Sequence, residues 1–188
     1  MVELGANINE TRAKDGMTPL LAAIQNGSEI IVRYLVEHGA NVNHLRENGD
    51  TPLLFAVCQE NDNLVKCLVE LGADVNKANN NGDTPLIYAC EEANETIVKC
   101  LVEHGADINK ANNRESIPLL IALNPMNKNV AIIKYLVEHG ADVNIIGNNG
   151  ISNSTPLMEV SLQGDKELIQ YLIEHGADIN KANKHGLK

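Results

Sequence analysis

The sequence predicts an all-α solenoid, in which pairs of short antiparallel helices stack side by side and are joined by β-hairpin or turn loops. The first observation is a nine-residue motif, LVEHGADIN at 101–109, which returns with small changes at 35–43, 68–76, 136–144 and 172–180. Its glycines are spaced by 33, 33, 35 and 36 residues. The second is a proline that recurs at positions 19, 52, 85, 118 and 156 and follows threonine in all but one copy. One unit of this length cannot bury its apolar face alone, so neighbouring units are expected to stack.

Each unit contains signals for two helices, as the third unit illustrates. Threonine before Pro85 predicts a helix start, because threonine caps the helix and proline fits its first position. The apolar run that follows predicts a short helix stopping near Glu92. Asn94 is expected to cap a second helix, whose apolar residues within 97–102 share one face. Gly105 is expected to end it in the left-handed conformation, and the Asn- and Gly-rich segment that follows predicts a turn or hairpin.

The D-x-G-x-T-P-L start, the G-A-D-x-N end and the 33-residue period resemble ankyrin repeats over essentially the whole chain. With no polar cap evident at either end, we interpret the chain as a piece of a longer array. The resemblance divides a single domain, 1–188, into a partial repeat 1–12, repeats at about 13–45, 46–78, 79–111, 112–146 and 147–182, and the start of a further repeat at 183–188.

The chain departs from the family pattern at a few positions. Repeat four has Ile117 and Glu115 in place of threonine and glycine, and repeat five has Val160 where alanine is usual. The family's histidine after T-P-L is replaced by an apolar residue in every repeat, which predicts apolar packing in place of a polar ladder. These residues are Leu21, Leu54, Ile87, Leu120 and Met158.

Charge and composition limit the function classes. Fifteen basic and twenty-five acidic residues give a net charge of −10, which argues against a nucleic-acid partner and favours a basic protein partner. The sequence contains no apolar run of 18 residues, and its first residues do not have the pattern of a signal peptide. We therefore expect an intracellular, cytoplasmic, monomeric protein that does not contact a membrane.

The Glu-His pairs of the motif could suggest catalysis or metal binding. However, His38, His104, His139 and His175 precede the glycine that ends each second helix, where a charged imidazole meets the helix dipole. Equivalent residues of stacked units lie ~8–10 Å apart, too far to share one ion. Cys67 and Cys100 share a register position with Tyr34, Tyr135 and Tyr171, which indicates a packing site. We expect no enzyme activity, no cofactor and no metal.

The resemblance implies instead a concave groove that grips partners, formed by loop tips and the exposed side of each first helix. Most of its residues are polar or acidic and few are aromatic, so either affinity is modest or the partner supplies the anchors. The expected partner-binding residues are Lys14, Asp15, Met17, Gln25, Asn26, Glu47, Asn48, Asp50, Cys58, Gln59, Asn80, Asn81, Asp83, Glu91, Glu92, Asn113, Arg114, Ser116 and Asn124.

Two functions remain open from the sequence. The first is a non-catalytic module that binds another protein through this groove, and the second is a structural spacer within a larger multi-domain protein. The insertion LNPMNKNV at 123–130, in which Pro125 is expected to end a helix early, is either a neutral change in a surface loop or a protrusion that shapes the partner site.

Overall fold

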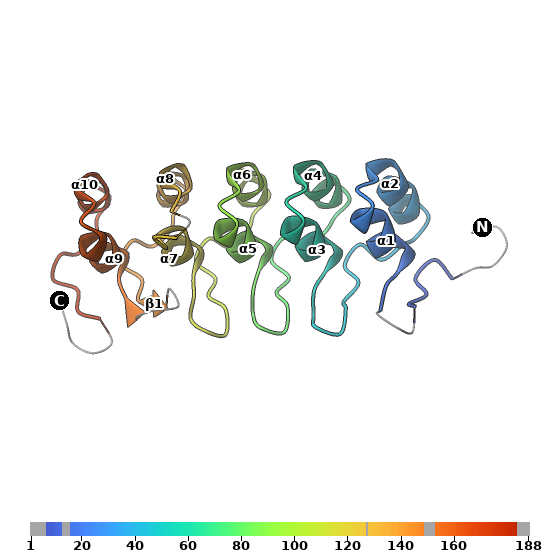
Figure 1. Cartoon of the computed structure of the whole chain (residues 1–188), viewed down its shortest axis with the longest axis horizontal. Coiled ribbons are helices and arrows are strands. Elements are labelled where there is room, and N and C mark those ends of the chain that lie inside the picture. The colour runs from blue at the N-terminus through green and yellow to red at the C-terminus, as the bar shows by residue number, and fades with distance from the viewer. Residues whose placement is uncertain (1–6, 13–15, 127, 149–152, 184–188) are drawn as a thin grey trace.

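The protein is a row of helix pairs in the computed structural model, which describes residues 7–12, 16–126, 128–148 and 153–183. The first helices of the pairs (α1, α3, α5, α7, α9) form an inner row, the second helices (α2, α4, α6, α8, α10) form an outer row, and long loops project from the inner row (Figure 1). The predicted all-α solenoid is confirmed. The elements are α1 (Pro19–Gln25), α2 (Glu29–Glu37), α3 (Pro52–Cys58), α4 (Asp62–Glu70), α5 (Pro85–Glu91), α6 (Glu95–Glu103), α7 (Pro118–Ala122), α8 (Val130–Glu138), β1 (Gly147–Asn148), β2 (Asn153–Ser154), α9 (Pro156–Gln163) and α10 (Lys166–Glu174).

The inner helices begin as the Thr-Pro signal predicts. The hydroxyl of Thr84 accepts a hydrogen bond from the backbone N–H of Ile87 at 3.3 Å, and the other Thr-Pro pairs repeat this bond at 3.1–3.3 Å. Ile117 makes no side-chain cap, and α7 has only five residues where α5 has seven. As expected from Pro125, this helix ends early, and the loop after it carries Met126 with 92% of its surface exposed.

The outer helices end at the conserved position of the repeat motif. His104 is the C-cap of α6, and its Nδ1 donates to the carbonyl oxygen of Cys100 at 2.7 Å, a contact that recurs at the ends of α2, α8 and α10. Gly105 follows with φ +86°, as do the equivalent glycines with φ between +87° and +97°. The Glu-His-Gly end of the motif therefore has the predicted structural role. The histidine of each such end forms a hydrogen bond with a carbonyl of the last helical turn.

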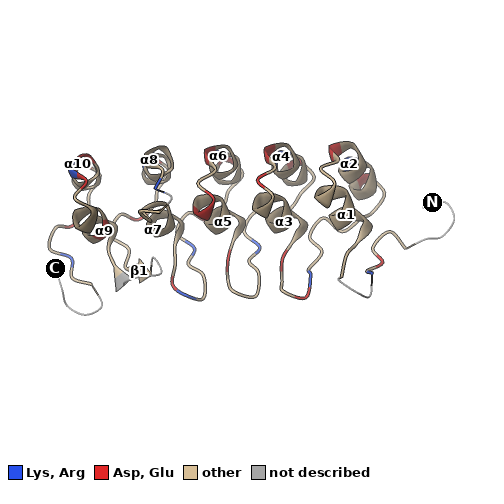
Figure 2. Ribbon diagram, viewed as in Figure 1, with Lys and Arg blue, Asp and Glu red and all other residues tan. Residues whose placement is uncertain are grey.

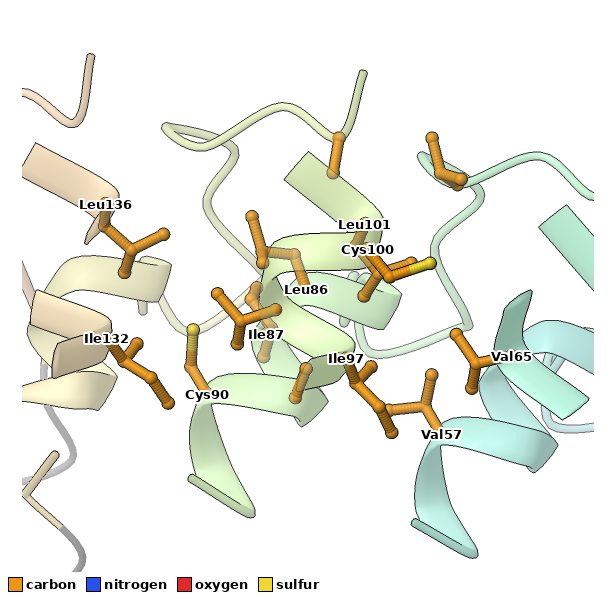
Figure 3. Packing of buried hydrophobic residues seen from close by; sticks show 14 of the residues in the cluster. Val57, Val65, Leu86, Ile87, Cys90, Ile97, Cys100, Leu101, Ile132 and Leu136 are labelled. Carbon is orange, nitrogen blue, oxygen red and sulfur yellow. The ribbon is translucent and has the colours of Figure 1, made fainter. Parts of the chain in front are cut away.

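The core runs through the stack without interruption. Residues of neighbouring repeats interlock, as Val57 does with Ile97 and Cys90 with Ile132 (Figure 3). Leu54, Ile87 and the other apolar residues at the family's histidine position are fully buried, except Met158, which is half-buried. Cys67 and Cys100 are also buried, which confirms that they occupy a packing site.

The loops are turns more than hairpins. Within the described residues, paired strands occur only in the last long loop, where β1 and β2 are antiparallel, and Arg12 and Met17 form an isolated bridge. Elsewhere each loop closes through a backbone bond, for example from the N–H of Asn79 to the carbonyl of Asp83 at 3.1 Å. Much of the two partial terminal repeats falls in 1–6 and 184–188, outside the described residues.

Candidate partner-binding surface

The last residue of the repeat motif ties neighbouring repeats together. Asn76 donates from Nδ2 to the carbonyl of Gly105 at 2.9 Å, and its Oδ1 accepts from the N–H of Asp107 at 2.7 Å. Asn9, Asn43, Asn109 and Asn144 make the same two bonds to the repeat that follows each of them. Their distances are between 2.7 and 3.3 Å. This asparagine ladder fixes the spacing of the loops, so the surface they form is preorganised.

The loop tips are joined in the same way. Nδ2 of Asn80 donates to the carbonyl of Glu47 at 2.9 Å, and Nδ2 of Asn113 donates to the carbonyl of Asn80 at 3.0 Å. Part of the hydrogen-bonding capacity of Asn80 and Asn113, both expected to contact a partner, is therefore used within the stack. Their exposed edges remain accessible.

Carboxylates behind the tips also have partners within the stack. Asp50 accepts from Nδ2 of Asn79 at 3.0 Å, and Asp83 accepts from Nδ2 of Asn112 at 2.6 Å. Both aspartates are half-buried. Ser116 stands at the same register position in repeat four, and it differs from the expectation because only 8% of its surface is exposed.

The other expected residues lie largely on the surface. Glu47, Asn48, Asn81 and Arg114 at the tips are exposed, and Met17 is half-buried beside its bridge with Arg12. Lys14 and Asp15 lie outside the described residues. The residues at the ends of the inner helices are Gln25, Asn26, Cys58, Gln59, Glu91 and Glu92, all exposed, and Asn124, which is half-buried.

Two aromatic residues of the inner helices were missed by sequence reasoning. Phe55 and Tyr88 are half-buried at the position four residues after the threonine, where the other repeats have Ala22, Ile121 and Glu159. The Arg46 guanidinium lies over the Phe55 ring, 5.4 Å from its centroid. The available signal was variability, because this position changes residue type in every repeat while its neighbours stay apolar.

Acidic groups surround the end of α3. Although the Cys58 residue is exposed, partial desolvation of its thiol raises the pKa to about 11, and the negative charges of Asp50, Glu92 and Glu91 raise it further. Burial also raises the pKa of Tyr88, with contributions from Cys58, Asp83 and Asp50. These shifts show that carboxylates of repeats two and three act on the same small region of the inner row.

The same group of acidic residues affects the pKa of Glu91. Partial desolvation of its carboxylate raises the pKa first, the charges of Asp83 and Glu92 raise it further, and the guanidinium of Arg114 opposes the shift. Figure 2 shows the acidic colour gathered at the end of α5. We call Asp50, Asp83, Glu91 and Glu92, together with Phe55 and Tyr88 of the inner helices α3 and α5, the acidic–aromatic patch.

The described side chains of this surface are suited to non-covalent contacts with a partner. Among the residues that the structure describes, no group of three or more His, Cys, Asp or Glu could hold a metal ion. The described segments also contain no helix long and apolar enough to cross a membrane. The patch offers carboxylates for a cation and ring faces for apolar or cationic contact.

The family model described as Ankyrin repeats (3 copies) matches four overlapping stretches, residues 1–79, 44–112, 76–147 and 112–183. The chain belongs to the ankyrin repeat family. A search of curated proteins gives no match to it.

Ankyrin repeats are generally modules for protein–protein interaction and are typically non-catalytic. In this ankyrin array the stacked loops and the inner helices form the surface whose residue types vary between repeats, whereas the core and the asparagine ladder repeat. Variable exposed positions on a fixed scaffold are where specificity resides in repeat proteins.

Proposed function

We propose that this ankyrin array is a non-catalytic binding module that grips another protein, one with a basic surface, through the groove of loop tips and inner helices. The observation that carries this proposal is the acidic–aromatic patch. Desolvation raises the pKa of Glu91, and the negative charges of Asp83 and Glu92 raise it further, so a cationic group placed beside Glu91 would relieve this repulsion. Half-buried Tyr88 and Phe55 supply the aromatic contact area that interface anchors commonly use.

Electrostatic attraction to such a patch has a measurable signature. Binding should weaken as salt rises, because exposed charges are screened over ~10 Å at 0.1 M ionic strength. It should also lower the pKa of Glu91 and Cys58, since a bound cation stabilises their charged forms. In this proposal the chain forms one domain spanning 1–188, which acts as a monomer in the cytoplasm.

The test is a pair of matched charge reversals. Glu92→Lys changes the patch, and Glu37→Lys changes another exposed acid, at the end of an outer helix. A partner recovered from native cell extract should bind Glu92→Lys at least tenfold more weakly than wild type, and Glu37→Lys within twofold, by isothermal titration calorimetry. Equal affinities for the two variants would remove the patch from the binding surface.

A second function, a spacer that sets the distance between other parts of a larger protein, is favoured by the asparagine ladder. Bonds of this kind join each described repeat to the next, which would make the array stiff. This alternative predicts that no partner is recovered with the isolated array, whatever the charge at Glu92.

A further inference from the structure

Three outer helices share a ring contact that the other two lack. In α2, α8 and α10 a tyrosine lies against the histidine one turn later, with ring centroids 4.0, 3.9 and 4.0 Å apart. These pairs are Tyr34–His38, Tyr135–His139 and Tyr171–His175. Each tyrosine ring therefore lies against the C-terminal end of its own helix.

A lysine of the preceding repeat covers two of these rings. Nζ of Lys99 lies 5.7 Å from the centroid of Tyr135, and Nζ of Lys134 lies 5.3 Å from the centroid of Tyr171. Both distances are within the ~6 Å at which a cation interacts favourably with a ring face. In repeats four and five the tyrosine ring thus contacts an imidazole of its own repeat and an ammonium group of the preceding repeat, and we call this position the tyrosine slot.

Repeat three keeps the slot but not the ring. Cys100 stands where the tyrosine would be, and His104 is still held by its bond to the Cys100 carbonyl at 2.7 Å. Lys66 takes the register position of Lys99 and Lys134, one repeat earlier. A cleft of about 360 Å³ opens at this place, lined by Lys66, Glu70, Thr96, Lys99, Cys100, Glu103 and His104.

Repeat two lacks both the tyrosine and the histidine of this position. It also has a cysteine, Cys67, but Leu71 replaces the histidine. The cation of the preceding repeat, Arg33, is bound to Glu70 at 2.6 Å and to Glu29 at 3.0 Å. Within the described residues, repeat three is therefore where a small side chain, a histidine and a lysine at this register coincide.

We propose that this cleft receives an aromatic side chain of a partner protein, in the place that the chain's own tyrosine takes in repeats one, four and five. The site lies on the outer row of helices, so it is separate from the groove of the proposed function and does not depend on it. Most of the lining is exposed, including Lys66, Glu70 and Glu103. Such an open rim suits a side chain presented on a larger surface, because free small ligands usually have 70–90% of their surface buried, by a rough general estimate.

The probe is p-cresol, which is the tyrosine side chain alone. Titrated into ¹⁵N-labelled protein, it should shift the amide signals of residues 99–104 and the imidazole signals of His104 in a saturable way. N-acetyl-tyrosinamide, which carries a peptide backbone on both sides of the same ring, should give a dissociation constant within about threefold of p-cresol. If p-cresol binds and the amide does not, the cleft takes free aromatic molecules, and docking of a protein side chain is overturned.

Substitutions test the slot directly. Cys100→Tyr places the chain's own ring in the cleft and should weaken p-cresol binding at least tenfold, whereas Cys100→Ala leaves the cleft open and should stay within twofold of wild type. Because the array already folds with this tyrosine in α8 and α10, Cys100→Tyr should unfold at a temperature no lower than wild type. Unchanged p-cresol binding to folded Cys100→Tyr would overturn the proposal.

Two lysine substitutions, Lys66→Gln and Lys134→Gln, test the proposal even if Cys100→Tyr does not fold. Lys66→Gln removes the cation expected to cover the guest ring and should weaken p-cresol binding about two- to fivefold. Lys134→Gln removes the same kind of cation from the filled slot of Tyr171 and should leave the affinity unchanged. Equal effects of the two substitutions, or shifts centred away from residues 99–104, would overturn the proposal.

Discussion

The asparagine ladder predicts a specific loss of stability when one rung is removed. Asn76→Ala deletes two hydrogen bonds between repeats three and two, at 2.9 Å to the Gly105 carbonyl and at 2.7 Å from the Asp107 N–H. Each such bond contributes about 0.5–1.5 kcal/mol net. Since Asn76 is half-buried and Gly105 is exposed, water replaces part of what is lost, and we expect a decrease of about 1–2 kcal/mol in the free energy of unfolding.

The chain supplies its own control for this prediction. Asn180 has the same register position, is exposed, and makes no rung to a following repeat within the described residues. Urea unfolding followed by circular dichroism should therefore give a change below about 0.5 kcal/mol for Asn180→Ala. For Asn76→Ala the melting temperature should fall by about 2–8 °C, at ~2–4 °C per kcal/mol for a chain of this size. Equal stabilities of the two variants would refute the reasoning that the rung, rather than the asparagine itself, stabilises the stack.

Two further predictions concern the loops and the patch. Gly105 and Gly82 both have positive φ, +86° and +79°, but a Cβ at Gly105 meets nothing within 4 Å whereas one at Gly82 lies 2.7 Å from the backbone N of Asn113. Because of backbone strain alone, Gly105→Ala should lower the free energy of unfolding by about 1–2 kcal/mol. Gly82→Ala should lower it by at least about 1 kcal/mol more, because its Cβ also meets the Asn113 backbone. A smaller loss for Gly82→Ala than for Gly105→Ala in urea unfolding would contradict this contact. The Cys58 thiol, with its pKa raised to about 11, should react with iodoacetamide roughly a hundredfold more slowly at pH 8 than a free thiol. Replacing Glu91 and Glu92 by glutamine removes two of the charges that raise this pKa and should speed the reaction, while desolvation keeps the rate below that of a free thiol. A wild-type rate equal to that of a free thiol would contradict the raised pKa.

Much of the fold could be predicted because each repeat carries local signals that agree with the stacked arrangement. Threonine before proline, asparagine before the outer helix and glycine after it act through bonds within a few residues, so their effect can be read without the neighbouring repeat. Pro125 ended its helix early for the same local reason. The asparagine of the motif was read only as a turn residue, because its partners lie in the next repeat, about 30 residues away.

The surface was less predictable than the fold. Ser116 was expected on the groove surface from its register position alone, yet its small side chain is buried. Phe55 and Tyr88 were passed over because the expected groove was drawn from polar positions. The cleft at Cys100 depends on a ring that is absent and on Lys66 in the preceding repeat, so no single segment of the sequence predicts it.

Hydrogen bonds between repeats also limit which side chains of the groove are available to a partner. Four residues of the expected groove form hydrogen bonds with a neighbouring repeat: Asn80, Asn113, Asp50 and Asp83. A partner that broke these bonds would destabilise the array, and this cost would offset part of the binding free energy. Glu92 is acidic, exposed and located at the end of an inner helix, and its charge raises the pKa of Glu91, so a cation beside it would reduce repulsion without breaking a bond of the asparagine ladder. Within the proposed binding groove, we therefore expect the charge at the end of α5, rather than the amides of the loop tips, to determine which partner binds.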